Sequence, residues 1–163
     1  MTNDLHLRRK LTLRAGGRQI VLVKRPVESI EHVLAKAFLW ALYLPLYPDA
    51  TVEPRWTDGR YRPDVLMLGR DGQPRFWAEA GRVGSEKLRK MLSRFPDTHL
   101  VISKWNVRLD MHESMLRDAL EGVRRTAPVQ LLSIPADAER FIAPDGTITI
   151  TFDDVEVRSV EGE

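Results

Sequence analysis

The amino-acid sequence predicts an α+β (mixed α/β) protein in which helices flank a central sheet. Short strand-like segments recur beside Gly-Gly and Asp-Gly dipeptides, which favour tight hairpin turns. Apolar residues at helical spacing fill three other segments. Because the two kinds of segment are interspersed along the chain, the helices can pack on one shared sheet.

Length and composition favour a single globular domain over residues 1–163. The chain is 43% hydrophobic and 29% charged, as soluble proteins commonly are, and about 150 residues suffice to bury a core. No apolar run approaches the roughly 20 residues that span a bilayer, so no membrane contact is expected. The chain has no Cys and its start has no long apolar stretch, so we expect a reducing cytoplasm.

The first elements are predicted to be a β-hairpin and a long helix. Residues 5–24 alternate apolar and polar residues on both sides of Gly16-Gly17, the pattern of a hairpin with a two-residue turn. Residues 26–44 carry apolar residues at helical spacing until Pro45 stops the helix. We expect this amphipathic helix to pack on the sheet.

Residues 51–80 are predicted to form an antiparallel meander of three short strands. Asp58-Gly59 and Asp71-Gly72 mark the two turns, and their spacing leaves no room for helices between the strands.

The second half of the chain alternates helix and strand before a final hairpin. The predicted elements are a helix that starts at Gly84 or Ser85 and ends at residue 95, a strand over 98–103, a helix over 110–125 and a strand over 129–134. A hairpin about Asp145-Gly146 and a loose acidic end are expected within residues 139–163.

Two acids of the meander are predicted to face each other. A two-residue turn at Asp71-Gly72 pairs Arg70 with Gln73, and counting outward sets Asp64 opposite Glu79 on one face of the sheet. Like charges about 5 Å apart destabilise a sheet unless a cation lies between them. Mg²⁺ typically takes one or two carboxylates together with waters and phosphate oxygens. The pair is therefore a candidate site for a divalent cation.

Counting residue pairs outward from the turn at Asp58-Gly59 in the same way adds a third acid beside Asp64 and Glu79. That count sets Glu53 opposite Asp64. Pro54 and Pro63 lie opposite each other in the same pairing, and neither can donate to the ladder. We therefore expect this pairing to fray before it reaches Glu53.

Asp64 and Glu79 lie on the same face of the sheet only if the turn at Asp71-Gly72 has two residues. One extra residue in the Asp71-Gly72 loop would turn Glu79 to the other face. In the alternative interpretation, both acids are exposed and are neutralised by nearby Arg residues. Glu79 lies between Ala78 and Ala80, where an exposed charge is less expected.

Basic residues concentrate around these acids. Residues 55–94 hold ten Arg or Lys against five Asp or Glu, whereas residues 128–163 hold two against eight. The planar Arg fork suits bidentate phosphate contacts, although a solvated basic face gives the same counts. The candidate nucleic-acid contacts are Arg62, Arg75, Arg82 and Arg89.

The segment from residue 28 to 103, with Pro63-Asp64 and Glu79, resembles the core of the PD-(D/E)xK nuclease superfamily. That restriction-endonuclease-like core runs helix, three-stranded meander, helix and strand. Within the superfamily, the chain resembles the YaeQ family through RPVESIEHVLAKAFLWAL and WAEAGRVGSEKLRKM. The resemblance covers most of the chain, with the core over residues 26–134.

The resemblance implies a metal site. Asp64, Glu79 and the backbone carbonyl of Ala80 would hold Mg²⁺ or Mn²⁺, and Glu28 would be an outer ligand. The metal would lower the pKa of the attacking water and bind a phosphate oxygen during hydrolysis of a phosphodiester.

The lysine of the superfamily motif is missing from its usual place. It belongs two residues after the Glu, where this chain has Gly81. Relatives without it often supply a lysine from the following helix, which here offers Lys87 or Lys90, to orient the water and stabilise charge on phosphorus. With Leu88 at the centre of the buried face, Lys87 lies at the edge of that face and Lys90 nearly opposite, which favours Lys87.

The sequence leaves two predicted functions open. The first is a metal-dependent phosphodiesterase acting on DNA or RNA, which the paired acids favour. The second is a catalytically silent protein of the same fold that binds nucleic acid or a protein partner through its Arg-rich face, which Gly81 favours. The four His residues show no close ligand spacing, and we expect each at the surface or the core edge: His6, His32, His99 and His112.

Overall fold

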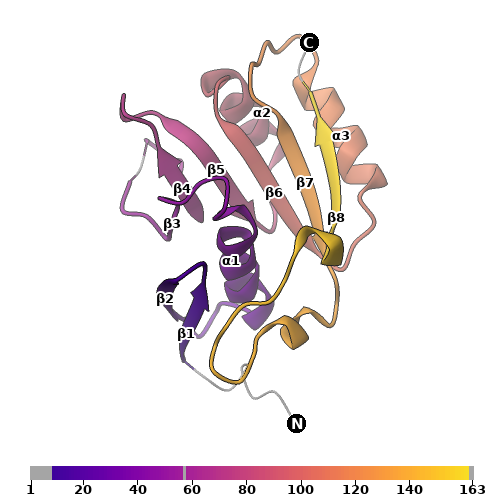
Figure 1. Cartoon of the computed structure of the whole chain (residues 1–163). Helices are drawn as coiled ribbons and strands as arrows, with labels where there is room; N and C mark the ends of the chain where they lie inside the picture. The colour runs from indigo at the N-terminus through magenta and orange to yellow at the C-terminus, as the bar shows by residue number, and fades with distance from the viewer. Residues whose placement is uncertain (1–8, 57, 162–163) are drawn as a thin grey trace.

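The computed structural model describes residues 9–56 and 58–161, which form a mixed sheet with one helix on one face and two on the other (Figure 1). In order across the sheet, the strands are β3 (Thr51–Val52), β4 (Val65–Leu68), β5 (Pro74–Ala80), β6 (His99–Trp105), β7 (Val129–Ile134) and β8 (Glu156–Val160). The remaining elements are the hairpin β1 (Lys10–Ala15) and β2 (Arg18–Val23), the helices α1 (Ile30–Tyr43), α2 (Ser85–Arg94) and α3 (Asp110–Leu120), and the short 3₁₀ turns η2 (Ala138–Phe141) and η3 (Phe152–Asp154).

The α+β class and the order of the main elements are as predicted. β3, β4 and β5 form the antiparallel meander, β5, β6 and β7 run parallel, and β8 is antiparallel to β7. The opening hairpin turns at Gly16-Gly17, as expected for the described part of residues 5–24; residues 5–8 lie outside the described residues. None of the described helices is long and apolar enough to cross a membrane.

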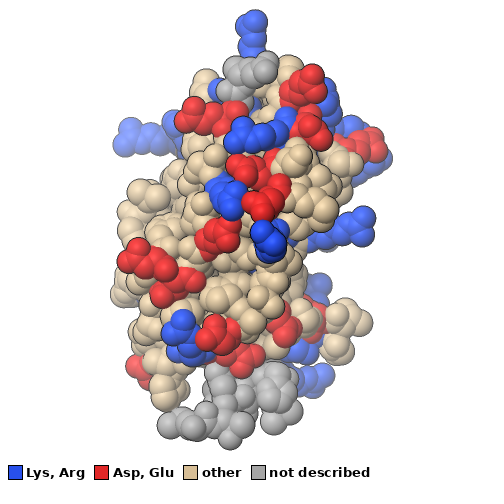
Figure 2. Space-filling model, turned by 90° about the vertical axis from the view of Figure 1, so that its right-hand side faces the viewer, with Lys and Arg blue, Asp and Glu red and all other residues tan. Residues whose placement is uncertain are grey.

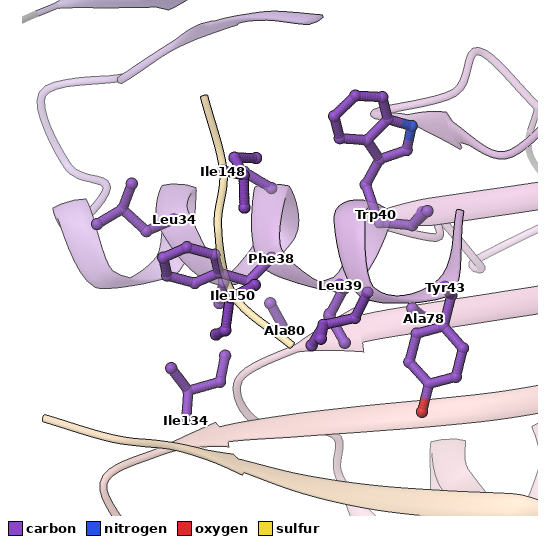
Figure 3. Close-up of a cluster of buried hydrophobic side chains, with 14 of the residues drawn as sticks. Leu34, Phe38, Leu39, Trp40, Tyr43, Ala78, Ala80, Ile134, Ile148 and Ile150 are labelled. Atoms are coloured by element: carbon purple, nitrogen blue, oxygen red, sulfur yellow. The ribbon is translucent and has the colours of Figure 1, made fainter. Parts of the chain in front are cut away.

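Helix α1 is buried along most of its length. Its N-cap is Ser29, whose side chain accepts a hydrogen bond from the backbone N–H of His32 at 3.1 Å. Figure 3 shows Phe38 of α1 beside Ile150 of the returning C-terminal segment, with Ile134 of the sheet on the far side of Ile150. Because α1 is covered on both sides, its polar side chains have fixed positions relative to the sheet.

Helices α2 and α3 cover the opposite face, and α3 is shorter than predicted. It ends at Leu120 rather than at residue 125. Gly122 has a φ of +73°, which breaks the helix, and the Arg125 guanidinium turns back to donate to the carbonyls of Leu92 and Phe95 near the end of α2. Those carbonyls have no partner within α2, so Arg125 stabilises the end of one helix at the expense of extending the other.

The turn between β4 and β5 differs from prediction, yet the strand register is the predicted one. Gly69 donates to the carbonyl of Gln73 at 2.8 Å, so the loop between them is one residue longer than a two-residue turn. The ladder then shifts by one residue, and Arg75 of β5 is left unpaired in a bulge. The two irregularities cancel, so Val65 pairs with Ala78, as a two-residue turn would require.

The C-terminal prediction was right about the reversal at Asp145-Gly146 and wrong about the end of the chain. The hairpin about Asp145-Gly146 is reduced to a tight turn with a single bridge between Ile142 and Ile148, and residues 156–160 form β8 instead of a loose end. In β8, Val160 is buried, and Glu156 and Ser159 are exposed. The pairing of β8 with β7 covers an edge that would otherwise expose unpaired backbone groups.

Replacing Gly146 by Ala should destabilise the protein more than replacing Gly122 by Ala. Both glycines have positive φ, which costs an L-residue about 1 to 2 kcal/mol. A Cβ at Gly146 would also lie 2.3 Å from the backbone oxygen of Thr12, whereas one at Gly122 meets nothing within 4 Å. Urea unfolding should show at least about 2 kcal/mol of additional loss for Gly146→Ala; equal losses would contradict the close backbone approach.

Candidate functional site

Asp64 and Glu79 lie at the end of β5, where the β4–β5 ladder finishes. The register that pairs Val65 with Ala78 brings the two acids next to each other. The Asp64 carboxylate accepts the backbone N–H of Ala80 at 2.8 Å, and the Glu79 carboxylate accepts the indole N–H of Trp77 at 3.0 Å. The Glu79 residue is only 7% exposed and the Asp64 side chain 18%. Each carboxylate is therefore partly desolvated and oriented by one fixed donor.

Burial raises the pKa of both carboxyl groups. The negative charge of Asp64 raises the pKa of Glu79 further, and the charge of Glu53 does the same for Asp64. The Ala80 N–H and the nearby His32 counteract part of the effect at Asp64. Two charged carboxylates are thus held together in a place that disfavours their charge.

The structure separates the two candidate lysines of α2. The Lys87 ammonium lies 3.7 Å from the Glu79 carboxylate. Lys90 instead pairs with Glu86 at 3.0 Å, and its side chain is 59% exposed. Lys87 is therefore the α2 lysine at the site.

Helix α1 contributes charged residues that the sequence analysis did not assign. Lys36 is 4% exposed, and its ammonium donates to Glu28 at 2.6 Å and to Glu53 at 2.7 Å. His32 Nδ1 lies 2.8 Å from Glu28, and its Nε2 lies 3.9 Å from Asp64. Glu28, expected as an outer metal ligand, is thus held by Lys36 and His32. Polar residues at every fourth position of an apolar helix were the signal that pointed to this cluster.

The β3–β4 ladder ends before Glu53, as expected, although the Glu53 backbone still bonds that of Asp64. The β3–β4 register follows the count about Asp58-Gly59 as far as the pair of Val52 with Val65. Glu53 then takes a φ of +50° and donates its backbone N–H to the carbonyl of Asp64 at 2.8 Å. This left-handed backbone is uncommon for a residue other than Gly, and Glu53 bonds Lys36 from it.

The four candidate nucleic-acid Arg residues are all exposed, but they do not form one group. Arg62 precedes Pro63-Asp64 and Arg82 follows Gly81, so both lie close in sequence to the acids. Arg75 lies in the bulge at the far end of β5, and Arg89 reaches the carbonyl of Glu121 at 3.4 Å. Figure 2 shows acidic and basic side chains intermixed on the face that carries α3 and β8, so that face is not a basic surface.

The four His residues have different environments. His32 lies in the candidate site, and His112 is half-buried on α3. His99 is 8% exposed and contacts Tyr47 and Gln130 at 2.7 Å each, so it is a core residue with a satisfied ring. His6 lies outside the described residues.

The charges around Asp64 leave the site negative. Four carboxylates stand against two ammonium groups, a formal excess of two negative charges before His32 is counted. These groups are Glu28, Glu53, Asp64, Glu79, Lys36 and Lys87. Within residues 9–56 and 58–161, no three His, Asp or Glu side chains are arranged to hold a metal ion together. Asp64 and Glu79 offer two carboxylates, a set that suits Mg²⁺ or Mn²⁺ with water or phosphate oxygens in the other positions.

Comparison with known proteins connects this arrangement to a fold. No protein-family model matches the chain, and no curated protein matches it. A crystal structure of the YaeQ protein from Pseudomonas syringae superposes with a TM-score of 0.59 and 16% identity, covering 94% of each chain. The chain has the YaeQ fold. The YaeQ protein from Xanthomonas axonopodis pv. citri gives a TM-score of 0.55 and 16% identity, covering 81% of this chain and 75% of that one. The likeness to these YaeQ proteins extends over the sheet and its helices.

Replacing Asp64 by Asn together with Glu79 by Gln should stabilise the metal-free protein at neutral pH. The pKa of each carboxyl is raised by folding, so the folded wild type binds more protons than the unfolded chain, and its stability falls as pH rises through the folded pKa values. The amides keep the accepted hydrogen bonds without charge. Urea unfolding in EDTA should show a gain on the order of 1 kcal/mol at pH 7 that disappears in acid; the same pH dependence in both proteins would contradict the assigned environment.

Replacing Lys36 by Met should destabilise the protein strongly. It leaves Glu28 and Glu53 without their ammonium partner, and breaking a buried ion pair costs about 3 to 5 kcal/mol. Adding Glu28→Gln and Glu53→Gln should recover much of the loss. The control Lys10→Met, at an exposed position of β1, should change stability by less than about 0.5 kcal/mol in the same unfolding experiment. A similar small change for Lys36→Met would contradict its role as counter-ion.

Proposed function

We propose that this chain is a metal-dependent phosphodiester hydrolase of the PD-(D/E)xK type, related to the YaeQ family and acting on nucleic acid. The observation that carries the proposal is the buried pair of Asp64 and Glu79. Both pKa values are raised by burial, and the surrounding side chains leave a formal excess of two negative charges before His32 is counted. A divalent cation between the carboxylates would neutralise that charge.

The chemistry of the available ligands supports Mg²⁺ or Mn²⁺. Asp64 and Glu79 would bind the ion through carboxylate oxygens, with the carbonyl of Ala80 as a further oxygen donor. Glu28 is hydrogen-bonded to Lys36 and His32. Its role would be to hold these α1 residues near Asp64. When bound, the ion supplies a water of lowered pKa and polarises a phosphate oxygen.

The protein's own groups would orient the reactants. Trp77 fixes Glu79, and the N–H of Ala80 fixes Asp64, so neither carboxylate needs to reorganise during the reaction. The Lys87 side chain is 39% exposed and contacts Glu79 at 3.7 Å. Its remaining ammonium hydrogens can donate to an attacking water and to a phosphate oxygen as negative charge develops there.

Two basic residues support nucleic acid as the substrate class. Arg62 and Arg82 are exposed, and they lie two residues before Asp64 and three residues after Glu79 in the chain. Exposed Arg next to a phosphodiester site would neutralise flanking phosphates. The YaeQ fold supports the architecture of the proposal rather than the reaction.

A second candidate is a catalytically silent protein that binds nucleic acid or a protein partner. Gly81 favours it, because this position lacks the lysine of the superfamily motif. The two candidates differ in whether Asp64 and Glu79 bind a cation.

Calorimetric titration with Mn²⁺ and Mg²⁺ distinguishes the candidates. The wild type should release or absorb heat on binding one ion, and the Asp64→Asn, Glu79→Gln double variant should not. Hydrolysis of plasmid and single-stranded DNA or RNA should require the metal. Lys87→Gln should lower the rate by about 100-fold, whereas Lys90→Gln on the same helix should change it less than about twofold. Absence of metal binding by the wild type would exclude the hydrolase and leave the second candidate.

A further inference from the structure

Lys104 is a half-buried lysine beside the candidate site that the proposed reaction does not use. It lies at the end of β6, which runs parallel to β5 with Ala80 paired to Ser103. Lys104 is therefore the cross-strand neighbour of Gly81. Because partners in a parallel ladder project to the same side, its side chain starts on the face that carries Glu79.

The Lys104 ammonium has no carboxylate partner among the described residues. Its hydrogen bond goes to the backbone carbonyl of Gly81, at 2.8 Å. Lys36, which is buried, has two carboxylates within 2.7 Å. A partly desolvated ammonium without a carboxylate partner gains from an added anion, so Lys104 is available to an anionic ligand.

Two further nitrogen-bearing side chains lie near Lys104. Burial lowers the pKa of Lys104, and the positive charge of Arg82 lowers it further. Burial also lowers the pKa of His112 on α3, and the charge of Lys104 adds to this effect. Three elements thus bring basic groups to one place, at the carboxyl ends of β5 and β6, where open sheets with parallel strands commonly bind their ligands.

The surroundings of Gly81 are not crowded. A Cβ at this position would meet no heavy atom closer than the Cδ2 of His32, at 4.0 Å. Gly81 thus separates the two acids from the Lys104 ammonium in the chain without placing a side chain of its own between them. From the strand spacing, the Cα of Lys104 lies about 8 Å from that of Glu79.

We propose that Lys104, with Arg82 and His112, forms a phosphate-binding subsite for the nucleic acid, next to the phosphodiester held at Asp64 and Glu79. The subsite deepens the proposed function and rests on it for the identity of the ligand. Its ligand is a backbone phosphate of a single-stranded segment, one of the phosphates that flank the bond to be cleaved.

The subsite is tested by binding of a fluorescent single-stranded oligonucleotide without metal, in EDTA, over a series of KCl concentrations. Each lost phosphate contact lowers the slope of log Kd against log salt by about 0.7 for a single strand. Lys104→Gln should show that decrease together with a loss of affinity of about tenfold, and Lys104→Arg should keep the wild-type slope. Lys10→Gln, at an exposed position of β1, is the matched control and should bind like the wild type. Thermal unfolding of each variant checks that Lys104→Gln is folded.

Further binding measurements distinguish a failure of the phosphate subsite from a failure of the proposed hydrolase activity. The Asp64→Asn, Glu79→Gln variant should keep the full salt slope, because Lys104 is unchanged; this result would support the subsite even where hydrolysis fails. An unchanged slope in folded Lys104→Gln would overturn the subsite while leaving the metal site intact. Inorganic phosphate at matched ionic strength tests the other source of the anion. Lys104-dependent binding of phosphate without oligonucleotide binding would overturn nucleic acid as the ligand, and binding of neither would overturn the subsite.

Discussion

The antiparallel ladder between β4 and β5 is the constraint on which the candidate site depends. Pairing of Val65 with Ala78 brings Asp64 and Glu79 together at the end of the ladder. Their hydrogen bonds then come from β5 itself, through the backbone of Ala80 and the indole of Trp77. A shift of the β4–β5 register by one residue would turn the Glu79 side chain toward α1, so that it no longer lay beside Asp64. The bulge at Arg75 therefore matters to the site although it lies at the opposite end of β5.

The second constraint is electrostatic, because the sheet buries charges from both of its faces. Lys36 of α1 neutralises Glu28 and Glu53 through short contacts, while Asp64 and Glu79 have less compensation. Lys104 presents the converse case, a half-buried cation bonded to a carbonyl. The proposed binding of a metal ion and a phosphate rests on this unbalanced negative charge beside unbalanced positive charge.

Sequence patterns predicted most of the elements, and the misses have local physical causes. Turn dipeptides and apolar periodicity located the meander, α1 and α2. The length of α3 was wrong because Arg125 bonds the end of α2 instead of continuing its own helix. β8 was missed because its segment is short and acidic, which is typical of a loose end. It forms a strand only because the edge of β7 offers backbone groups to pair with. The register was right although the turn was not, since the bulge compensates for the longer loop.

By itself, the sequence determined which strands form the meander, because turn residues and side-chain alternation are local properties. It also predicted Asp64 opposite Glu79, but the structure reaches that register through a longer loop and a compensating bulge. The tertiary structure decided which charged groups surround the pair. Lys36, His32 and Lys104 come from α1 and β6, and packing of a helix and a parallel strand against β5 sets their distances. Contacts between segments far apart in the chain produce no periodic pattern in the sequence. Which charged groups lie next to each other could therefore be read only from the folded molecule.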